Sequence, residues 1–381
     1  MVTARGGDPE SPAGHSVRGS NVSGRSLLPG PRGPTAVLAI QIKTLTMRPL
    51  KALVTGGGGF LGSAIVRLLR GRGDEVVTVS RGDYPELRAL GVTTIRADIT
   101  DFPSITQAAA GCDVVFHTAA RAGVWGSFES YRKPNVAGTE AVLAACQAGG
   151  VPRLVFTGSP SVVFDGSDQE GGTSALPYAS PASSHYSATK AAAERRVLET
   201  NSKALATVSL RPHLIYGPGD PHLVPRVIDR AARGRLALVG DGSNRVSLTY
   251  IENAAAAHVQ AADRLSFHAL CAGRAYFIND PEPVVFGEWL STLVARLGLP
   301  PIERRLSMAA AVRLGAVLEF VWKGFSLAGE PPLTRSVARN LGASHWYSIE
   351  EAVRDFGYAP PVSASEGFER TVEWFRPRVP R

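Results

Sequence analysis

A run of four glycines between a strand-like and a helix-like segment constrains the fold of this chain more than any other feature. Residues 51–55 (KALVT) are short and apolar, as in a buried strand, and residues 60–70 have helical periodicity. Gly56, Gly59 and Gly62 recur at every third position between and into them. In such a turn the first glycine permits a tight bend, the second lets backbone approach a pyrophosphate, and the third lets helix pack on strand. The pattern predicts a dinucleotide-binding turn, with a purely structural glycine turn as the alternative.

The residues that open the helix and end the next strand are predicted to complete the cofactor site. Phe60 and Leu61 begin the helix, whose N-terminus offers free N–H groups and a positive dipole to phosphates. Ser80 and Arg81 stand at the end of the second expected strand, where NAD binders usually place an acid for the ribose 2′-hydroxyl. A guanidinium group matches a phosphate instead, so NADP(H) is favoured over NAD(H). The alternative is that Arg81 only ends the strand in solvent.

Three further residues are expected to border the cofactor. Asp98 and Ile99 follow the third expected strand and are placed to border the adenine ring, although Asp98 fits a loop-capping role equally well. Ala119 follows the fourth expected strand, where the chain passes the cofactor. His117, in the same segment, is interpreted as a packed neighbour of the cofactor rather than a catalyst.

Apolar strands alternate with helices between residues 51 and 211. Beyond the first strand, the expected strands are 75–80, 93–96, 113–117, 153–157 and 206–211, and the clearest helices are 134–147 and 184–199. This alternation is typical of a parallel sheet with helices on both faces. We therefore predict an α/β fold, with a Rossmann doubly wound parallel sheet over residues 47–212. A smaller C-terminal α/β substrate lobe is expected over residues 213–376, with some strands returning to the Rossmann sheet.

Two stretches depart from this pattern. Residues 1–46 are dense in Gly, Pro and Ser and lack periodicity, so they are predicted to be a disordered tail, and Met47 resembles a natural start. Residues 308–327 are apolar but interrupted by charges, which predicts an amphipathic helix of the smaller lobe. Contact of this helix with a membrane surface is the alternative. No apolar run reaches the roughly 18–20 residues that a membrane-spanning helix needs.

Composition excludes several function classes. The net charge is +8, but no basic stripe is interleaved with aromatic residues, so no nucleic-acid partner is predicted. The three cysteines, Cys112, Cys146 and Cys271, are far apart and form no pair, which indicates buried thiols in a reducing, cytoplasmic setting. The eight histidines show no metal-ligand spacing, so no metal site is predicted.

The candidate catalytic residues lie in and near the helix predicted over 184–199. Tyr186 and Lys190 are four residues apart and share a helical face, and a neighbouring cation lowers the pKa of a phenol. The pair therefore suits acid–base chemistry at a carbonyl or alcohol. Ser159, after the fifth strand, is expected to hydrogen-bond the substrate oxygen, with Ser161 and Thr157 as fallbacks. Asn135 is expected to hold a carbonyl or water in a proton relay to Lys190, and an ordinary helix cap is its alternative.

Together these residues resemble the extended short-chain dehydrogenase/reductase superfamily. Within it, the chain is similar to the 3β-hydroxysteroid dehydrogenase and sterol-4-carboxylate dehydrogenase branch, and most similar to the 2-alkyl-3-oxoalkanoate reductases of bacterial olefin biosynthesis. The motifs that support the resemblance are TGGGGFLG (55–62), RAGVWGSFESY (121–131), HYSATKAAAE (185–194), LRPHLIYGPGD (210–220) and TYIENAAAAH (249–258). The resemblance implies a Rossmann fold, Ser–Tyr–Lys catalysis and NADPH as hydride donor. Gly158 and Pro160 depart from the commoner Thr-Ser-Ser-Ala loop.

The resemblance implies reduction of a β-keto group on a long apolar substrate. Aromatic residues of the smaller lobe would line its site or form the lobe's core: Phe286, Trp289, Phe320, Trp322 and Phe325. The alternatives are oxidation of a 3β-hydroxysterol with a 4-carboxylate, sugar-nucleotide epimerisation, and an NADP-binding regulator without turnover. A homodimer, peripheral membrane contact and association with a thiolase-like condensing enzyme are the partners considered.

Overall fold

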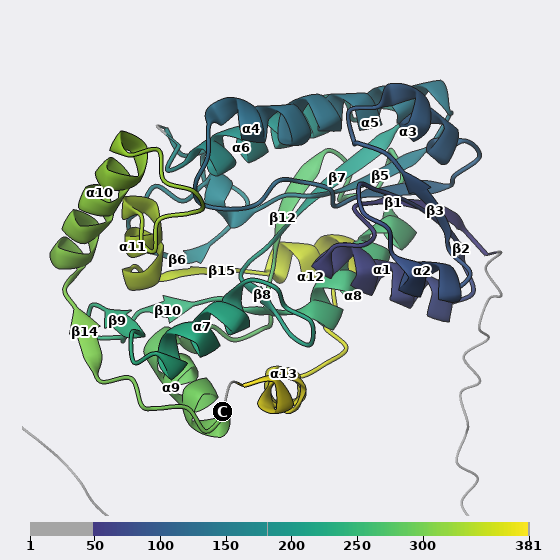
Figure 1. The fold of residues 1–381 in the computed structure, drawn as a ribbon. Helices are drawn as coiled ribbons and strands as arrows, with labels where there is room; N and C mark the ends of the chain where they lie inside the picture. Colours follow the sequence, from purple (N-terminus) through teal and green to yellow (C-terminus); the bar gives the residue numbers. More distant parts are fainter. Residues whose placement is uncertain (1–48, 181, 380–381) are drawn as a thin grey trace, which may run out of the picture. The chain divides into compact units, whose positions relative to one another are not determined.

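A parallel sheet of seven strands organises the part of the chain that the structure describes, residues 49–180 and 182–379 (Figure 1). In this computed structural model the strand order is β12-β7-β5-β4-β1-β2-β3, and every pairing is parallel. The strands are β1 (Lys51–Thr55), β2 (Glu75–Ser80), β3 (Thr93–Arg96), β4 (Val114–His117), β5 (Arg153–Thr157), β7 (Ala206–Pro212) and β12 (Arg274–Ile278). The predicted Rossmann fold is confirmed. The predicted tail, residues 1–46, lies outside the described residues.

The strand order reverses at β1, which lies between β2 and β4. Chain from β1 turns toward one side of the sheet and chain from β4 toward the other, so a crevice forms at the carboxyl ends of these two strands. In open α/β sheets, ligands bind at such a reversal. The glycine turn after β1 and the segment after β4 both lie there, which is why residues far apart in sequence meet.

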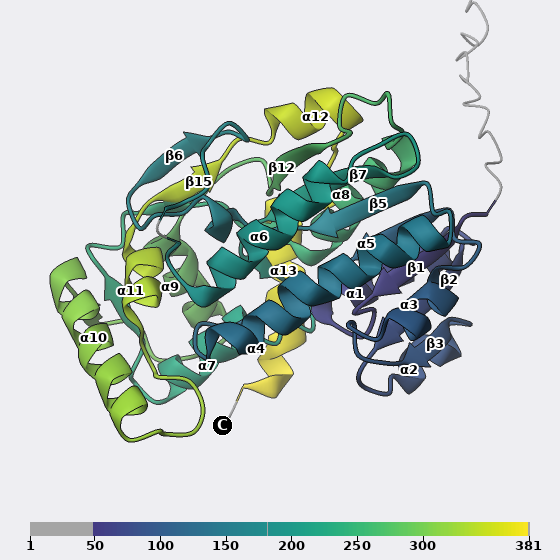
Figure 2. The same ribbon diagram turned by 90° about the horizontal axis from the view of Figure 1, so that it is seen from above.

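Helices cover both faces of the sheet because alternate strand residues point to opposite sides. Ala52 and Val54 of β1 pack with helices on one face, and Leu53 packs with helices on the other. The first face carries α1 (Phe60–Gly71) and α8 (Ile251–Arg264), and the second carries α3 (Phe102–Ala109), α5 (Gly138–Ala148) and α6 (His185–Glu199). Figure 2 shows α5 and α6 running side by side over the strands.

Two short helices complete this part. Helix α2 (Pro85–Ala89) follows β2, and α4 (Phe128–Arg132) leads into α5 through a widened π-helical turn at Lys133–Ala137. The sequence analysis expected the helix to begin only at residue 134, because the polar 128–132 segment shows little apolar periodicity. Single helical turns of 3₁₀ type occur at Pro160–Val162 and Arg376–Arg378.

The rest of the chain builds smaller sheets and helices beside the carboxyl edge. A four-stranded sheet has the order β13-β10-β15-β6. Two further sheets have two strands each, β8 with β11 and β9 with β14. The strands of these smaller sheets are β6 (Gln169–Gly172), β8 (Ile215–Tyr216), β9 (Ala237–Val239), β10 (Arg245–Val246), β11 (Thr249–Tyr250), β13 (Val284–Val285), β14 (Arg304–Leu306) and β15 (His345–Tyr347). The helices of this part are α7 (Leu223–Ala232), α9 (Phe286–Arg296), α10 (Met308–Gly324), α11 (Arg335–Gly342), α12 (Glu350–Phe356) and α13 (Ala364–Phe375).

Helix α10 covers most of the stretch that was predicted to be an amphipathic helix. It buries only Ala311 and Gly315, while Val317 and Phe320 are among its exposed apolar side chains. Among the described residues, no helix is long and apolar enough to cross a bilayer. Contact of α10 with a membrane surface and the domain boundary at residue 212 stay predictions.

Candidate active site

The glycine turn is packed so closely that a side chain at Gly56 or Gly62 would collide with neighbouring backbone. Gly56 has φ +71°, and a Cβ there would lie 3.0 Å from the backbone of Ala119. A Cβ on Gly62 would lie 2.2 Å from the carbonyl oxygen of Gly56, so α1 can pack this close to β1 only with glycine. Helix α1 begins at Phe60 with no side-chain cap and no acidic residue in its first turn. Its first amides are therefore directed at a site that fits an anionic dinucleotide.

At the end of β2 the structure brings together the residues expected near the ribose. The hydroxyl of Ser80 accepts a hydrogen bond from the Gly58 amide at 3.3 Å, which ties the strand to the glycine turn. Arg81 is exposed, and its charge helps to hold the pKa of Asp98 below the ordinary value. Tyr84 lies over Gly58, since a Cβ there would be 2.2 Å from the tyrosine ring. Sequence reasoning missed Tyr84, because nothing in its spacing marks it.

Asp98 and Ile99 have defined local contacts. The Asp98 carboxylate accepts hydrogen bonds from the amide and hydroxyl of Thr100, at 3.0 and 2.7 Å. These bonds are the largest causes that lower the pKa of Asp98. Ile99 packs against Gly138 at the start of α5. The contacts of Asp98 are those of a loop cap, and Ile99 is buried.

Tyr186 and Ser159 meet at the start of α6. Ser184 and Ser187 form a reciprocal capping box, with bonds of 3.1 and 2.9 Å, that fixes the first turn of the helix around Tyr186. The Ser159 hydroxyl lies near the Tyr186 phenol, and Ser161 donates its amide to the Ser159 oxygen at 3.2 Å. Burial is the largest influence on the phenol and raises the pKa of Tyr186, while the neighbouring Ser159 hydroxyl opposes this shift. Two hydroxyls therefore converge where a carbonyl oxygen could bind.

Lys190 lies one turn further along α6 and is buried. Its ammonium donates to the carbonyl oxygen of Thr157 at 2.6 Å and lies 4.0 Å from the ring centre of Phe156. Loss of water lowers the pKa of Lys190 to about 7, and the nearby Glu194 opposes that shift. The sequence argument expected Lys190 to lower the pKa of Tyr186. In this structure burial dominates and the pKa of Tyr186 is raised.

A buried ionic network lies beneath the catalytic loop. The Glu194 carboxylate accepts hydrogen bonds from Arg211 at 2.6 Å, Ser209 at 2.6 Å and Tyr178 at 2.8 Å. Neither charged group has more than 3% of its surface exposed. A Cβ on Gly158 would lie 2.6 Å from Glu194 and 2.7 Å from Ser209, so the loop rests directly on the network. The unusual glycine before Ser159 thus has a steric reason.

Asn135 lies in the π-helical turn and holds the loop after β4. Its side-chain oxygen accepts from the Arg121 amide at 2.7 Å, and its side-chain nitrogen donates to the Arg121 carbonyl at 3.1 Å. The same nitrogen donates to the Thr189 hydroxyl at 3.1 Å, which links this loop to α6 next to Lys190. These contacts position the loop, and the proton relay expected for Asn135 stays a prediction.

His117 is enclosed by hydroxyl groups. Its two ring nitrogens lie 2.7 Å from the hydroxyl of Thr55 and 2.9 Å from that of Thr139. Burial lowers the pKa of His117 to about 3. A neutral imidazole with both nitrogens hydrogen-bonded joins β1, β4 and α5. It is buried, which agrees with a packed neighbour rather than a catalyst.

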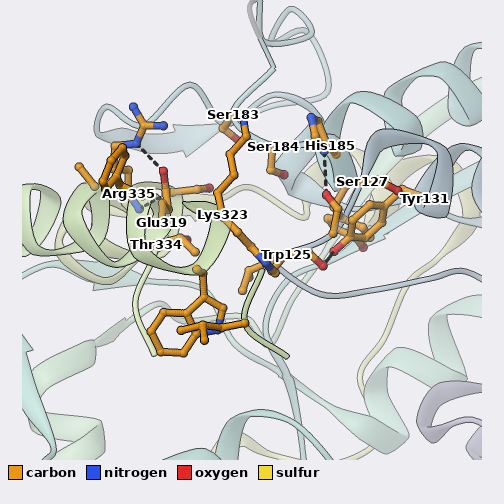
Figure 3. A pocket seen from close by; sticks show the side chains of 18 of the residues that line it. Trp125, Ser127, Tyr131, Ser183, Ser184, His185, Glu319, Lys323, Thr334 and Arg335 are labelled. Carbon is orange, nitrogen blue, oxygen red and sulfur yellow. Dashed lines mark hydrogen bonds and ion pairs between the residues drawn. The ribbon is translucent and has the colours of Figure 1, made fainter. Parts of the chain in front are cut away.

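A cavity of about 840 Å³ opens beside Tyr186 (Figure 3). One wall comes from the segment after β4 and the start of α6, including Trp125, Tyr131 and His185. The opposite wall comes from α10 and the start of α11, where Glu319 accepts from Arg335 at 2.7 Å. Tyr131 donates to the Trp125 carbonyl at 2.9 Å, which steadies the first wall. The cavity extends from Tyr186 to α10 and the start of α11 in the C-terminal part of the chain.

The aromatic residues considered for this cavity divide into three groups. Phe320 and Trp322 line the cavity. Phe286 and Trp289 are buried in the core and stack on each other. Phe325 is exposed, with 74% of its surface accessible. Helical spacing alone could not separate these fates, because it does not show which side of a lobe faces the sheet.

Comparison with known proteins decides the family. Residues 53–308 match the model of the 3-beta hydroxysteroid dehydrogenase/isomerase family. The chain belongs to this family. The resemblance predicted from the sequence is confirmed.

Relatives within this family are named reductases and dehydrogenases. The 2-alkyl-3-oxoalkanoate reductase of Stenotrophomonas maltophilia is 51% identical over 323 residues, covering 84% of this chain and 98% of that enzyme. The decarboxylating sterol-4-alpha-carboxylate 3-dehydrogenase of Mus musculus is 35% identical and covers 85% of this chain and 91% of that enzyme. This family member is accordingly an oxidoreductase of the extended short-chain dehydrogenase/reductase type.

Solved structures agree on the fold. MoeE5, determined in complex with UDP-glucose and NAD, superposes with a TM-score of 0.65 at 26% identity, covering 87% of this chain and all of that one. The protein described as gox2253 has a TM-score of 0.69 at 25% identity, covering 86% of this chain and 98% of that one. A solved structure of the same fold therefore binds NAD. This likeness does not decide between NAD and NADP for the present chain.

Proposed function

We propose that this family member reduces the 3-keto group of a 2-alkyl-3-oxoalkanoate to the 3-hydroxy acid, with NADPH as hydride donor. The observation that supports it most is the cavity of about 840 Å³ that Tyr186 lines, with the Ser159 hydroxyl near the Tyr186 phenol. The relatives at 51% and 45% identity that are named for this activity support the choice of substrate.

The proposed mechanism uses the two hydroxyls as a carbonyl clamp. Ser159 and Tyr186 would donate hydrogen bonds to the keto oxygen, which stabilises the negative charge that develops there. The bound nicotinamide would supply the hydride. Because burial raises the pKa of Tyr186, the phenol keeps its proton at neutral pH and can donate it to the new alcohol oxygen.

Lys190 and Asn135 would act around this pair. Lys190 would bind ribose hydroxyls with its ammonium group. The hydrogen bond from this group to the Thr157 carbonyl fixes the direction of the Lys190 side chain. Asn135 is proposed as a positioning residue, because it joins the Arg121 loop to Thr189 of α6. Orientation of substrate against cofactor and exclusion of water are then the main contributions of the protein.

NADP is proposed over NAD on charge. The end of β2 presents Ser80 and the exposed Arg81 and has no acid at the position that would accept from a ribose 2′-hydroxyl. Gly56, Gly59, Phe60, Leu61 and Gly62 would hold the pyrophosphate. Asp98, Ile99 and Ala119 would enclose the adenine end and the central part of the dinucleotide.

A second candidate is oxidative decarboxylation of a 4-carboxysterol, which the 35% identical mouse enzyme supports by its name. Activity with NADPH and a 2-alkyl-3-keto acid, set against activity with NAD and a 4-carboxysterol, separates the two. A tightly retained NAD that supports turnover without added cofactor would instead indicate epimerisation.

The catalytic assignment is tested by Tyr186→Phe. We expect kcat to fall about 100-fold or more while NADPH affinity, measured by fluorescence titration, stays unchanged. Tyr358→Phe is the matched control, since that buried phenol donates to the Asn279 carbonyl in the C-terminal part of the chain. Full activity of the Tyr186 variant would refute the assignment of the proton donor.

The proposed substrate also indicates where the enzyme acts in a sequence of reactions. A 3-keto acid with an alkyl branch at C2 arises when two acyl chains condense, so a thiolase-like condensing enzyme is the class that would supply it. Association with such an enzyme, a homodimer and peripheral membrane contact stay predictions. Neighbouring genes for condensing and ligase-type enzymes would support the first of these.

A further inference from the structure

A second cavity of about 610 Å³ lies on the other side of helix α10 from the first. Val124, in the loop after β4, lines both cavities, so the two approach each other at this residue. The segment between α10 and α11 also contributes to both, with Thr334 on the first cavity and Leu333 on the second. Helix α10 and this segment together separate the two cavities.

Helix α10 forms the separating wall because its opposite sides face different cavities. Ala316, Phe320 and Lys323 line the first cavity, and Leu314 and Leu318 line the second. Residues four apart share a side of a helix, whereas those two apart are rotated by about 200°.

The wall is held in place where α10 meets the segment before α11. A Cβ on Gly315 would lie 2.7 Å from the backbone of Thr334 and Arg335, so helix and segment are in backbone contact there. Ala311, one turn earlier, is fully buried. Two small residues thus let α10 seat closely, and the partition is a packed element of the fold rather than an isolated helix.

The second cavity has one apolar wall and one wall of partnered charges. Arg226 pairs with Glu330 at 3.0 Å, Arg233 pairs with Asp229 at 2.7 Å, and Arg230 donates to the Pro332 carbonyl at 2.6 Å. Its apolar wall consists of Ala237, Val239, Leu306, Leu314, Leu318, Leu333, Val337 and Leu341. These three arginine heads are engaged locally, Arg235 is a fourth arginine in the lining, and the apolar wall is the surface available to a hydrocarbon chain.

The junction at Val124 is fixed from both sides. The Val124 amide donates to the Glu330 carboxylate at 3.4 Å, which is the carboxylate that pairs with Arg226. Asn135 of the π-helical turn binds both backbone groups of Arg121, which lies three residues before Val124 in the same loop. The loop therefore lies in a set position between the catalytic pair and the second cavity.

We propose that the two hydrocarbon chains of the substrate separate at Val124 and occupy different cavities. This inference rests on the proposed function and deepens it. In a 2-alkyl-3-oxoalkanoate the two chains are attached to adjacent carbons, C2 and C3. C3 bears the reacting carbonyl, which must contact Tyr186 in the first cavity. One chain extends along Phe320 and Trp322 in the first cavity, and the other passes Val124 to the leucine wall of the second.

Three consecutive residues of α10 provide the test. Ala316→Trp fills the first cavity, Leu318→Trp fills the second, and Val317→Trp adds the same side chain at a position that is 59% exposed and lines neither. Because β-keto acids lose carbon dioxide on standing, the assay follows oxidation of 3-hydroxy acids by NADP⁺. One substrate has its long chain at C3 with a methyl at C2, the second has its long chain at C2 on a hydroxybutanoate, and the third is short at both.

The expected result is a crossed pattern. Each of the two filling variants should lose about 10-fold or more in kcat/KM on only one of the two long substrates, and the substrate affected should differ between the variants. This magnitude is expected because even one methylene in an apolar pocket changes kcat/KM about 10-fold or more. The short substrate and the Val317→Trp enzyme should be unaffected. Loss on the same substrate in both filling variants, or Leu318→Trp behaving like Val317→Trp, would overturn the proposal.

Two controls keep the outcomes separate. Equal unfolding midpoints and equal activity on the short substrate show that a filled cavity, and not misfolding, causes any loss. If the unmodified enzyme oxidises none of the three acids, the proposed function fails. If it oxidises them all and no variant discriminates between chains, only the separation of the chains fails.

Discussion

Replacing Glu194 by Gln tests whether the catalytic loop depends on a buried ion pair. The carboxylate is fully buried and accepts from Arg211, Ser209 and Tyr178 at 2.6–2.8 Å. An amide of the same shape removes the charge that compensates Arg211 and points donor hydrogens at groups that themselves donate. Since Gly158 lies against Glu194, the disturbance reaches the residue before Ser159.

The expected cost follows from what is left behind. Removing one partner of a buried ion pair typically costs about 3–5 kcal/mol, because the remaining charge is neither paired nor hydrated. Against a typical total stability of about 5–15 kcal/mol, this is a large fraction. Glu194 also opposes the lowering of the Lys190 pKa, so its loss would leave Lys190 less protonated at neutral pH and weaken NADPH binding as well.

Urea unfolding of the cofactor-free protein measures the stability change. Glu199→Gln is the matched control on the same helix. Glu199 also pairs with an arginine, Arg196 at 3.4 Å, but both side chains are exposed. This change should therefore alter stability by no more than about 0.5 kcal/mol. The double change Glu194→Leu with Arg211→Met removes both charges and should recover much of the loss. A Glu194→Gln protein as stable as the Glu199→Gln control would refute this reasoning.

Two further predictions concern the loop and the buried imidazoles. Gly158→Ala should lower kcat about 10- to 100-fold, measured at saturating NADPH, because the added Cβ would collide with Glu194 and Ser209 and shift the neighbouring Ser159. Gly71→Ala, with open space around it, should not lower kcat. Burial lowers the pKa of His117 to about 3 and of His258 to about 4, so the unfolded state binds more protons below about pH 6.5 and stability is lost as the pH falls. By about pH 5 each histidine should cost about 2 kcal/mol, and urea midpoints of His117→Gln should fall less steeply with pH than those of the unmodified protein; an equal slope would contradict this.

The Rossmann sheet and the turn could be predicted because their signals are local. The turn at Gly56–Gly62 combines a spacing with a strand before it and a helix after it, and each glycine has its own steric requirement. Tyr186 and Lys190 share a helical face at a spacing that needs no tertiary information. Ser159 could be placed after a strand, since parallel strands end at one edge of the sheet.

The missed features depend on contacts between distant residues. Glu194 and Arg211 look like ordinary surface charges in sequence, and only the packing of α6 on β7 makes them a buried pair. Tyr84 meets Gly58 across the crevice. The sign of the Tyr186 pKa shift was wrong for a related reason, because a cation four residues away was counted and the loss of water was not.

The two catalytic pKa shifts have one cause and favour one direction of reaction. Desolvation is the largest influence on both side chains and disfavours charge, so it raises the pKa of Tyr186 and lowers that of Lys190. A neutral phenol is a proton donor, which is what reduction of a ketone needs, whereas oxidation of the alcohol needs a phenolate to accept the proton. Raising the pH increases the phenolate fraction and thus favours oxidation relative to reduction. For the proposed reduction, burial of Tyr186 therefore also sets the acid–base form that a reductase needs.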